Sequence, residues 1–242
     1  MAEKRLDKLL SELGIASRRD LKQIIKSGRV TVDGRAVTAP ETRIDPDTCT
    51  VSLDGVSLCC RRFHYYMMDK PSGVLSVTED RKQKTVLDLL PEEQRRMGLF
   101  PVGRLDKDTS GLLLLTNDGD FAHRVISPKS GVEKLYLAEV DGSPDEADAA
   151  AFADGIVLAD GTKCLPAGLE LLGDGKCLVT VMEGKYHQVK RMLASRGKPV
   201  LKLRRLAVGE LRIEEGLGAG GFRELGEEEL CKVLPDFRLD KS

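Results

Sequence analysis

A polar segment that runs directly into an apolar one is the most unusual feature of this 242-residue sequence. Residues 103–111 carry Arg104, Asp106 and Asp108, and the leucine run 112–115 follows at once. A continuous apolar run bounded by turn residues predicts a buried strand. A carboxylate held beside a hydrophobic wall is suited to act as nucleophile or base. On the pattern alone, however, the two aspartates are more typical of turn residues.

The first 58 residues predict a compact module of two helices and a β-hairpin. An apolar stripe with the i, i+3, i+4, i+7 spacing of an amphipathic helix consists of Leu6, Leu9, Leu10 and Leu13. A second helix is expected over 18–27, because Ser17 is a typical N-cap residue. The dipeptide Asp33-Gly34 predicts a tight hairpin turn, and residues 50–53 predict a further short strand.

Residues 59–62 are expected to form a linker, and residues 63–242 a second domain with many strands. Strands are predicted over 63–68, 112–116, 135–140 and 176–182, with extended chain over 200–213. Helices are predicted over 85–90, ending before Pro91, and over 121–126, 144–153, 186–196 and 227–234. The predicted class is α+β: a small helix-helix-β-hairpin module followed by a mixed, mainly antiparallel α+β domain.

Charge is distributed unevenly along the chain, although 38 basic and 39 acidic residues nearly cancel. Residues 1–35 carry nine basic and five acidic residues, a net charge of +4. Residues 176–206 have a net charge of +8, whereas residues 141–161 have a net charge of -6. Two basic blocks suit a polyanionic partner. The alternative is that basic and acidic blocks pair with each other in the fold.

Composition also limits the class of protein. No apolar run approaches the roughly 20 residues that span a bilayer, and the first residues lack the apolar stretch of a secretory signal. We therefore expect a cytoplasmic protein with no membrane partner. The six cysteines form no C-x-x-C pair, so reduced thiols are expected and a metal site is not.

Four segments, in order along the chain, resemble the motifs of one enzyme family. Residues 103–119 read Gly-Arg-Leu-Asp-x-x-Thr-x-Gly-Leu-Leu-Leu-Leu-Thr-Asn-Asp-Gly. This closely resembles the catalytic motif of pseudouridine synthases of the RsuA/RluA superfamily. Residues 69–73, 133–136 and 183–192 resemble its Asn-Lys-Pro-x-Gly, Lys-x-Tyr and late basic motifs, with Asp69 replacing the usual Asn. Residues 1–58 are similar to an S4 RNA-binding domain.

The resemblance implies a reaction and its catalytic residues. In that family uracil is detached from its ribose, turned and rejoined through C5, without a cofactor. Asp106 falls at the catalytic aspartate, which either attacks C1′ or assists formation of a glycal. Lys190 falls where the family has a basic residue beside it, and an opposite charge keeps a carboxylate ionised. Tyr136 falls at the active-site tyrosine; without the resemblance, Lys190 would be a solvated helix lysine and Tyr136 a half-buried strand aromatic.

Further residues are expected to contact RNA. They are Arg104, Arg18, Arg19, Lys22, Lys26, Lys70, His187, Arg191, Leu203 and Leu206. Arg104 would fill the space left by a flipped uridine or hold its phosphate, unless it forms a structural ion pair. The four cations of helix 18–27 would bind phosphates without reading sequence, unless they are simply solvated. Leu203 or Leu206 would pack on the uracil, unless both are core residues.

The late motif also points to a substrate. Its version over 186–192, Tyr-His-Gln-Val-Lys-Arg-Met, is similar to that of RsuA-type enzymes that modify small-subunit (16S) ribosomal RNA. The short C-terminus, with no basic tail after Leu239, agrees. We therefore expect a monomer that acts on one uridine of 16S rRNA within a partly assembled particle. The alternatives are a 23S rRNA synthase, an inactive RNA-binding assembly factor, or a hydrolase that uses Asp106 with Asp118.

Overall fold

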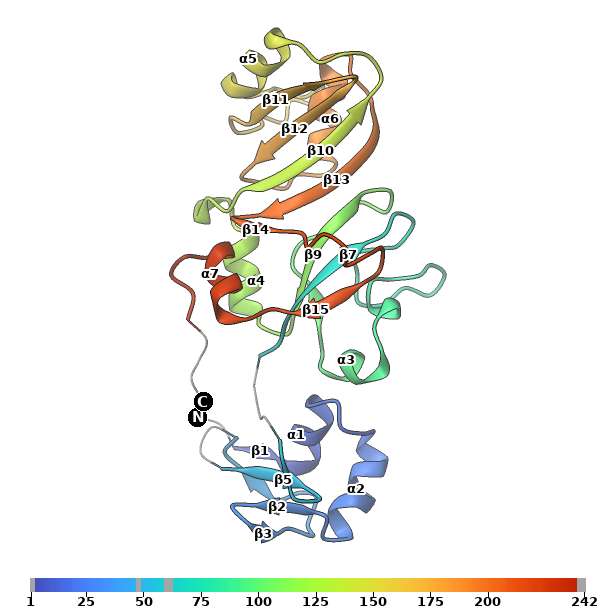
Figure 1. The fold of residues 1–242 in the computed structure, drawn as a ribbon, viewed down its shortest axis with the longest axis vertical. Coiled ribbons are helices and arrows are strands. Elements are labelled where there is room, and N and C mark those ends of the chain that lie inside the picture. The colour runs from blue at the N-terminus through green and yellow to red at the C-terminus, as the bar shows by residue number, and fades with distance from the viewer. Residues whose placement is uncertain (1–2, 47–48, 59–62, 239–242) are drawn as a thin grey trace. The chain divides into compact units, whose positions relative to one another are not determined.

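The computed structural model describes residues 3–46, 49–58 and 63–238. The described chain divides into two compact units (Figure 1). One unit holds the residues up to His64 together with Leu87–Phe100, and the other holds Tyr65–Val86 and Pro101–Arg238. Residues 87–100 thus group with the first unit, although the sequence assigns them to the second domain. The expected linker, 59–62, lies outside the described residues.

The N-terminal unit packs its helices around a leucine-rich core. Its elements are β1 (Lys4–Arg5), α1 (Leu6–Glu12), α2 (Arg18–Lys26), β2 (Val30–Val32), β3 (Arg35–Ala36), β4 (Arg43–Ile44), β5 (Val51–Leu53) and β6 (Val56–Ser57). Four strands form a sheet in the order β3-β2-β5-β6, and β1 pairs with β4. The predicted cap and turn are present: the Ser17 side chain accepts a hydrogen bond from the Asp20 amide, and Asp33 and Gly34 both have positive φ.

The segment around Pro91 differs from its prediction. Instead of one helix over 85–90, it contains a 3-10 turn η1 (Leu87–Leu89), then α3 (Glu92–Arg96) and the short strand β8 (Phe100–Pro101). Pro91 is the N-cap of α3 and not the stop of a helix. The fixed φ of proline is compatible with the first turn of a helix, so it starts one here.

The second unit is built on one large sheet. Its strands are β7 (Tyr65–Lys70), β9 (Ser110–Thr116), β10 (Lys134–Val140), β11 (Gly168–Gly173), β12 (Lys176–Val181), β13 (Val200–Val208), β14 (Leu211–Arg212) and β15 (Phe222–Glu224). The order is β11-β12-β10-β13-β9-β7-β15, with β14 on β13 and β8 on β9. Only β9 and β13 are parallel among the pairs with a described register. The predicted α+β class with a mainly antiparallel sheet is confirmed, but the edge strands β11 and β15 were not predicted.

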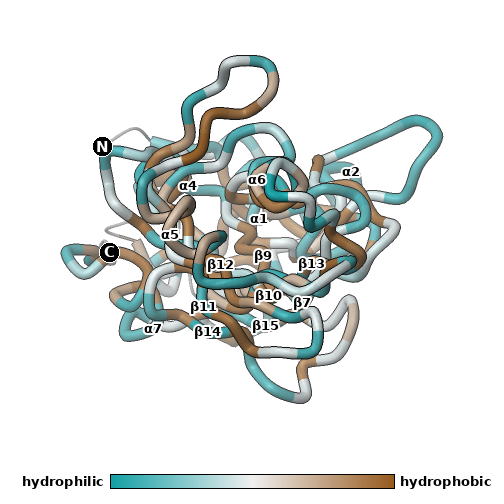
Figure 2. The backbone as a smooth tube through the Cα atoms, turned by 90° about the horizontal axis from the view of Figure 1, so that it is seen from above, coloured by the Kyte–Doolittle hydropathy of each residue, from teal (hydrophilic) through white to brown (hydrophobic). Residues whose placement is uncertain are grey.

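Helices cover this sheet at both ends. They are α4 (Gly119–Ile126), the 3-10 turn η2 (Pro128–Ser130), α5 (Glu146–Asp154), α6 (Gln188–Ser195) and α7 (Glu227–Val233). Phe152 of α5 and Met192 of α6 share one core with Val179 of β12. At the other end, the Tyr65 ring packs edge-on against Phe121 of α4, with centroids 5.1 Å apart. The apolar strand β9, which lies between β13 and β7 in the sheet, is brown in Figure 2.

No helix within the described residues is both long and apolar enough to cross a membrane.

The parallel contact of β9 with β13 depends on Gly111. Ser110 pairs with Arg204 and Gly111 with Arg205 at this point. A Cβ atom on Gly111 would lie 2.2 Å from the Arg205 carbonyl oxygen, and the glycine φ is +103°. Any side chain would therefore separate the two strands. The contact places the end of segment 103–111 against β13, which follows α6 in the chain.

We predict that Gly111→Ala lowers the free energy of unfolding by about 2–4 kcal/mol, through overpacking and a strained φ. Gly119→Ala is the matched control, because its Cβ meets no atom within 4 Å; it should change stability by less than about 1 kcal/mol. Urea unfolding of both variants measures the difference. Equal effects of the two substitutions would contradict the role of Gly111.

Candidate active site

Lys190 lies between the two aspartates of segment 103–111. Its Nζ is 2.9 Å from Asp106 Oδ2 and 2.5 Å from Asp108 Oδ1. His187 Nε2 lies 3.5 Å from the other Asp106 oxygen. Burial alone would lower the pKa of Lys190, but hydrogen bonds to Asp108 and Asp106 hold that pKa above its ordinary value. A positive charge therefore stays beside Asp106 at neutral pH.

The buried Lys70 side chain fixes the backbone of segment 103–111. It is fully buried at the end of β7. Its Nζ donates to the carbonyl oxygens of Pro71 at 3.0 Å, Asp106 at 3.2 Å, Lys107 at 3.3 Å and Thr109 at 2.7 Å. Burial lowers the pKa of Lys70 to about 8. These contacts contradict the prediction that Lys70 contacts RNA, because its ammonium is directed to the backbone that carries Asp106.

The turn before α6 is also fixed by side chains. Glu183 is buried, and its carboxylate accepts hydrogen bonds from Gln188 Nε2 and the Leu165 amide, both at 2.9 Å. Lys185 Nζ lies 2.5 Å from the same carboxylate. His187 then adopts the left-handed conformation, with φ +49°, as the N-cap of α6. This geometry directs His187 toward Asp106 and explains why the helix begins later than predicted.

A cavity of about 640 Å³ opens beside Asp106. Arg104, Tyr136 and His187 line it together with Asp106, although they come from the 103–111 segment, β10 and the start of α6. A recess of about 70 Å³ is lined by the same four residues and by Thr109 and Leu203. Asp106 and Tyr136, two of the three residues predicted as catalytic, therefore line these hollows together with Arg104, His187 and Leu203, which were predicted to contact RNA.

Other predicted residues lie elsewhere. Arg191 forms an ion pair with Asp160 at 2.5 Å and lines neither hollow. Leu206 lines neither hollow either. Asp118 is the N-cap of α4 and accepts a hydrogen bond from the Tyr65 hydroxyl at 2.7 Å. Asp118 therefore has a structural role, which does not support a hydrolase that pairs it with Asp106.

The late basic block is largely neutralised within the fold. Besides Arg191, Arg196 pairs with Asp148 at 2.9 Å, and both acids come from the acidic block 141–161. Lys202 pairs with Glu139 at 3.0 Å, and Arg204 holds Asp69 through two hydrogen bonds of 3.0 and 2.8 Å. The expectation that this block as a whole faces a polyanion is therefore wrong. The alternative, that basic and acidic blocks pair with each other in the fold, describes the late basic block better.

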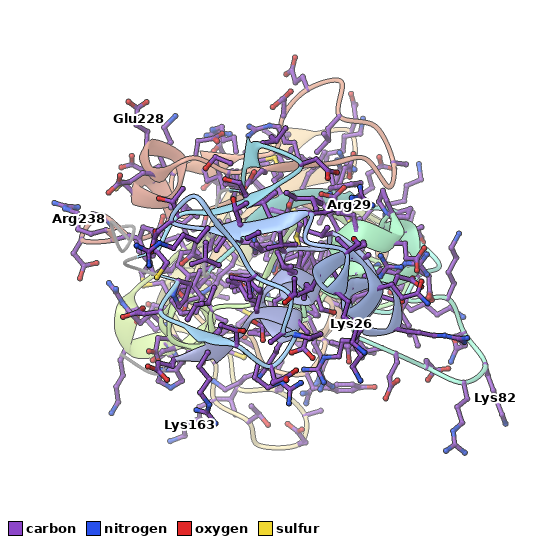
Figure 3. All side chains as sticks on the ribbon, turned by 90° about the horizontal axis from the view of Figure 1, so that it is seen from below. Lys26, Arg29, Lys82, Lys163, Glu228 and Arg238 are labelled. Carbon is purple, nitrogen blue, oxygen red and sulfur yellow. The ribbon has the colours of Figure 1, made fainter. Side chains whose placement is uncertain are left out.

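The cations of α2 differ from those of the late block. Arg18, Arg19, Lys22 and Lys26 are all exposed, and none forms an ion pair within the part of the chain that the structure describes. Figure 3 labels Lys26 on this helix. Three of the four line a shallow hollow with Arg5 and Asp7. This face keeps its positive charge available for a ligand.

Three residues of the site were not predicted from sequence. The Thr109 hydroxyl is buried at the recess and has no hydrogen-bond partner among the described residues. Lys134 and Arg205 line the larger cavity, and both are buried. Thr109 lies within the catalytic motif and Lys134 within the Lys-x-Tyr motif. The sequence therefore identified both segments, but it did not single out these two residues. No group of acids, histidines or cysteines in the described ranges could hold a metal ion.

Comparison with known proteins identifies the family of this chain. The family model described as RNA pseudouridylate synthase matches residues 64–195. The chain belongs to the RNA pseudouridylate synthase family. An S4 domain model also matches residues 4–48 of this synthase. The cavity around Asp106 thus lies in the matched catalytic region, and the free cations of α2 lie in the S4 region.

Relatives of the synthase match it over nearly its whole length. An uncharacterised RNA pseudouridine synthase of Bacillus subtilis is 44% identical over 230 residues, 93% of this chain and 96% of the relative. The ribosomal small subunit pseudouridine synthase A of Vibrio cholerae is 40% identical, over 95% of this chain and 99% of its own. A crystal structure of a pseudouridylate synthase covers 95% of this chain and 99% of its own, with 34% identity and a TM-score of 0.68.

The buried ammonium of Lys134 gives the synthase a testable pH dependence. Burial lowers the pKa of Lys134 from 10.5 to about 8. The folded protein therefore loses this proton near pH 8, whereas the unfolded chain keeps it until about pH 10.5. Unfolding takes up a proton in that window, so the contribution of Lys134 to stability rises with pH.

We predict that the difference in unfolding free energy between wild type and Lys134→Met increases from pH 7.5 to pH 10. Burial also lowers the pKa of Lys70 to about 8. Its contribution cancels in this difference, because both proteins contain Lys70. Lys163→Met, which removes an exposed lysine with no ion pair among the described residues, is the control and should show no comparable increase. Urea titrations across this range measure both, and a flat difference for Lys134→Met would refute the altered proton binding.

Proposed function

We propose that this synthase converts one uridine of 16S rRNA to pseudouridine, acting as a cytoplasmic monomer on a partly assembled small subunit. The main support is the match over 95% of the chain to enzymes named ribosomal small subunit pseudouridine synthase A, from Vibrio cholerae, Pseudomonas aeruginosa and Escherichia coli. Similarity of this extent includes the S4 region, where the substrate would be bound, as well as the catalytic region.

The reaction balances without any added reagent. The target uridine leaves the RNA stack, and this costs a few kcal/mol. The N1–C1′ bond breaks, the uracil turns, and a C1′–C5 bond forms. The C5 proton is lost and N1 gains one. Asp106 stabilises the sugar through its carboxylate, whether it attacks C1′ or assists glycal formation.

The surrounding residues have distinct proposed roles. Lys190 keeps the Asp106 carboxylate paired and oriented, at 2.9 Å. Tyr136 would stack on the uracil and take part in the transfer of the C5 proton. The free Thr109 hydroxyl can donate a hydrogen bond to the base, and Leu203 forms an apolar wall of the same recess. Arg104 is exposed and forms no ion pair among the described residues, so it is available to the flipped nucleotide or its phosphate.

We further propose that residues 1–58 bind the RNA, that 59–62 link the domains, and that 63–242 carry the reaction. The four free cations of α2 would contact phosphates and thereby position the substrate without reading its sequence. Such contacts depend on salt, so RNA affinity should fall as ionic strength rises. Sequence selection would come from the unpaired bases around the target.

The proposal is tested by mapping pseudouridine in the rRNA of cells that lack this protein. One 16S position should lose the modification, and a plasmid with the wild-type gene should restore it. A plasmid with Asp106→Asn should not, because the amide removes the catalytic charge while leaving its shape.

Purified Asp106→Asn should still bind 16S transcripts with wild-type affinity, which separates lost chemistry from lost binding. Loss of a 23S position with 16S intact would overturn the substrate assignment. Restoration by Asp106→Asn would overturn the catalytic role and leave an assembly factor.

A further inference from the structure

Two buried cations lie at the wall of the large cavity, beyond the recess beside Asp106. Lys134 and Arg205 are 8% and 5% exposed. Both line the 640 Å³ cavity, and neither lines the recess, whereas Tyr136 lines both. Lys134 precedes Tyr136 by two residues on β10. Arg205 lies on the neighbouring strand β13, directly opposite Tyr136. The three side chains therefore share one face of the sheet.

Both cations have donors that the fold does not use. Lys134 Nζ donates to the carbonyl oxygens of Val125 at 3.1 Å and Val132 at 2.6 Å, which leaves one of its three protons. Arg205 donates through Nε to the Leu112 carbonyl oxygen at 2.7 Å. Its two terminal nitrogens make no hydrogen bond within the described part of the chain.

Neither cation has a carboxylate partner among the described residues. The two acids that line the cavity are already engaged, Asp106 by Lys190 and Glu183 by Lys185. Removing two like charges from water without a counter-charge is costly. Burial and the nearby Arg205 both lower the pKa of Lys134, as this cost requires. An anion that enters the cavity would offset it.

We propose that Lys134 and Arg205 form a phosphate subsite for the RNA strand, beside the site of the target uridine. The inference rests on the RNA-modifying function, and it does not depend on which RNA is the substrate. While the uridine occupies the Asp106 end, the phosphodiester on one side of it enters the cavity. Its oxygens accept hydrogen bonds from Lys134 Nζ and the Arg205 guanidinium. Apolar walls from Val102, Leu114 and Val125 limit water and strengthen the contact.

The test uses the full-length protein and the RNA pentamer AAUAA, labelled with a fluorophore. Each linkage in turn is replaced by a neutral methylphosphonate, and affinity is measured by fluorescence anisotropy at fixed low salt. For the wild type, one linkage next to the uridine should stand out, with binding about tenfold weaker when it is neutral. Lys134→Met should bind the all-phosphate pentamer about tenfold more weakly and should no longer distinguish that linkage.

Lys163→Met is the matched control, since Lys163 is an exposed lysine of the same unit (Figure 3). It should keep the sensitive linkage. Lys134→Gln, which retains an amide donor for the two carbonyl groups, replaces Lys134→Met if the latter is not folded. A wild-type profile in which no linkage stands out overturns the subsite, and so does an unchanged profile in the Lys134 variants. The pentamer contains no ribosomal sequence, so failure here leaves the 16S assignment standing.

Discussion

The ion pair between Lys190 and Asp106 is the contact that the rest of the catalytic unit holds in place. It joins a segment that enters β9 to a helix that lies 84 positions further along the sequence. The two meet beside the point where β13, which follows α6, pairs in parallel with β9 at Gly111. Lys70 fixes the aspartate segment from beneath, and the Glu183–Gln188 contact fixes the turn that leads to Lys190. Each of these contacts orients one partner of the pair.

Several charged residues of the catalytic unit pair with one another within the fold. Arg196 and Arg204 pair with the buried carboxylates of Asp148 and Asp69. The pair of Arg191 with Asp160 is more exposed and contributes little to stability, about 0–1 kcal/mol. Several cations have no carboxylate partner in the described structure, and two groups of them stand out. One is the exposed face of α2, and the other is the buried pair Lys134 and Arg205. Both suit an RNA strand, the first through long-range attraction and the second through direct contact at the reaction site.

Much of this arrangement could be predicted from sequence, but the environment of the charges could not. Local signals gave the Ser17 cap, the Asp33-Gly34 turn and the buried strand β9, because each depends on neighbouring residues. The resemblance to the enzyme family, and not the residue pattern alone, pointed to Asp106, Tyr136 and Lys190. Lys70 was misjudged because a lysine in a turn motif is normally exposed, and its burial depends on β9 and the 103–111 segment. The late basic block was misjudged because its partners lie in strands and helices distant in sequence.

We expect the chemical step to require the positive charge of Lys190, held beside Asp106. The most direct test is the single-turnover rate of pseudouridine formation in saturating enzyme, for Lys190→Met and Lys190→Arg. We expect Lys190→Met to slow this step by about 100-fold or more, while RNA affinity stays within about threefold. Lys190→Arg should recover most of the rate, because it restores the charge. A wild-type rate for Lys190→Met would show that the step does not need this charge.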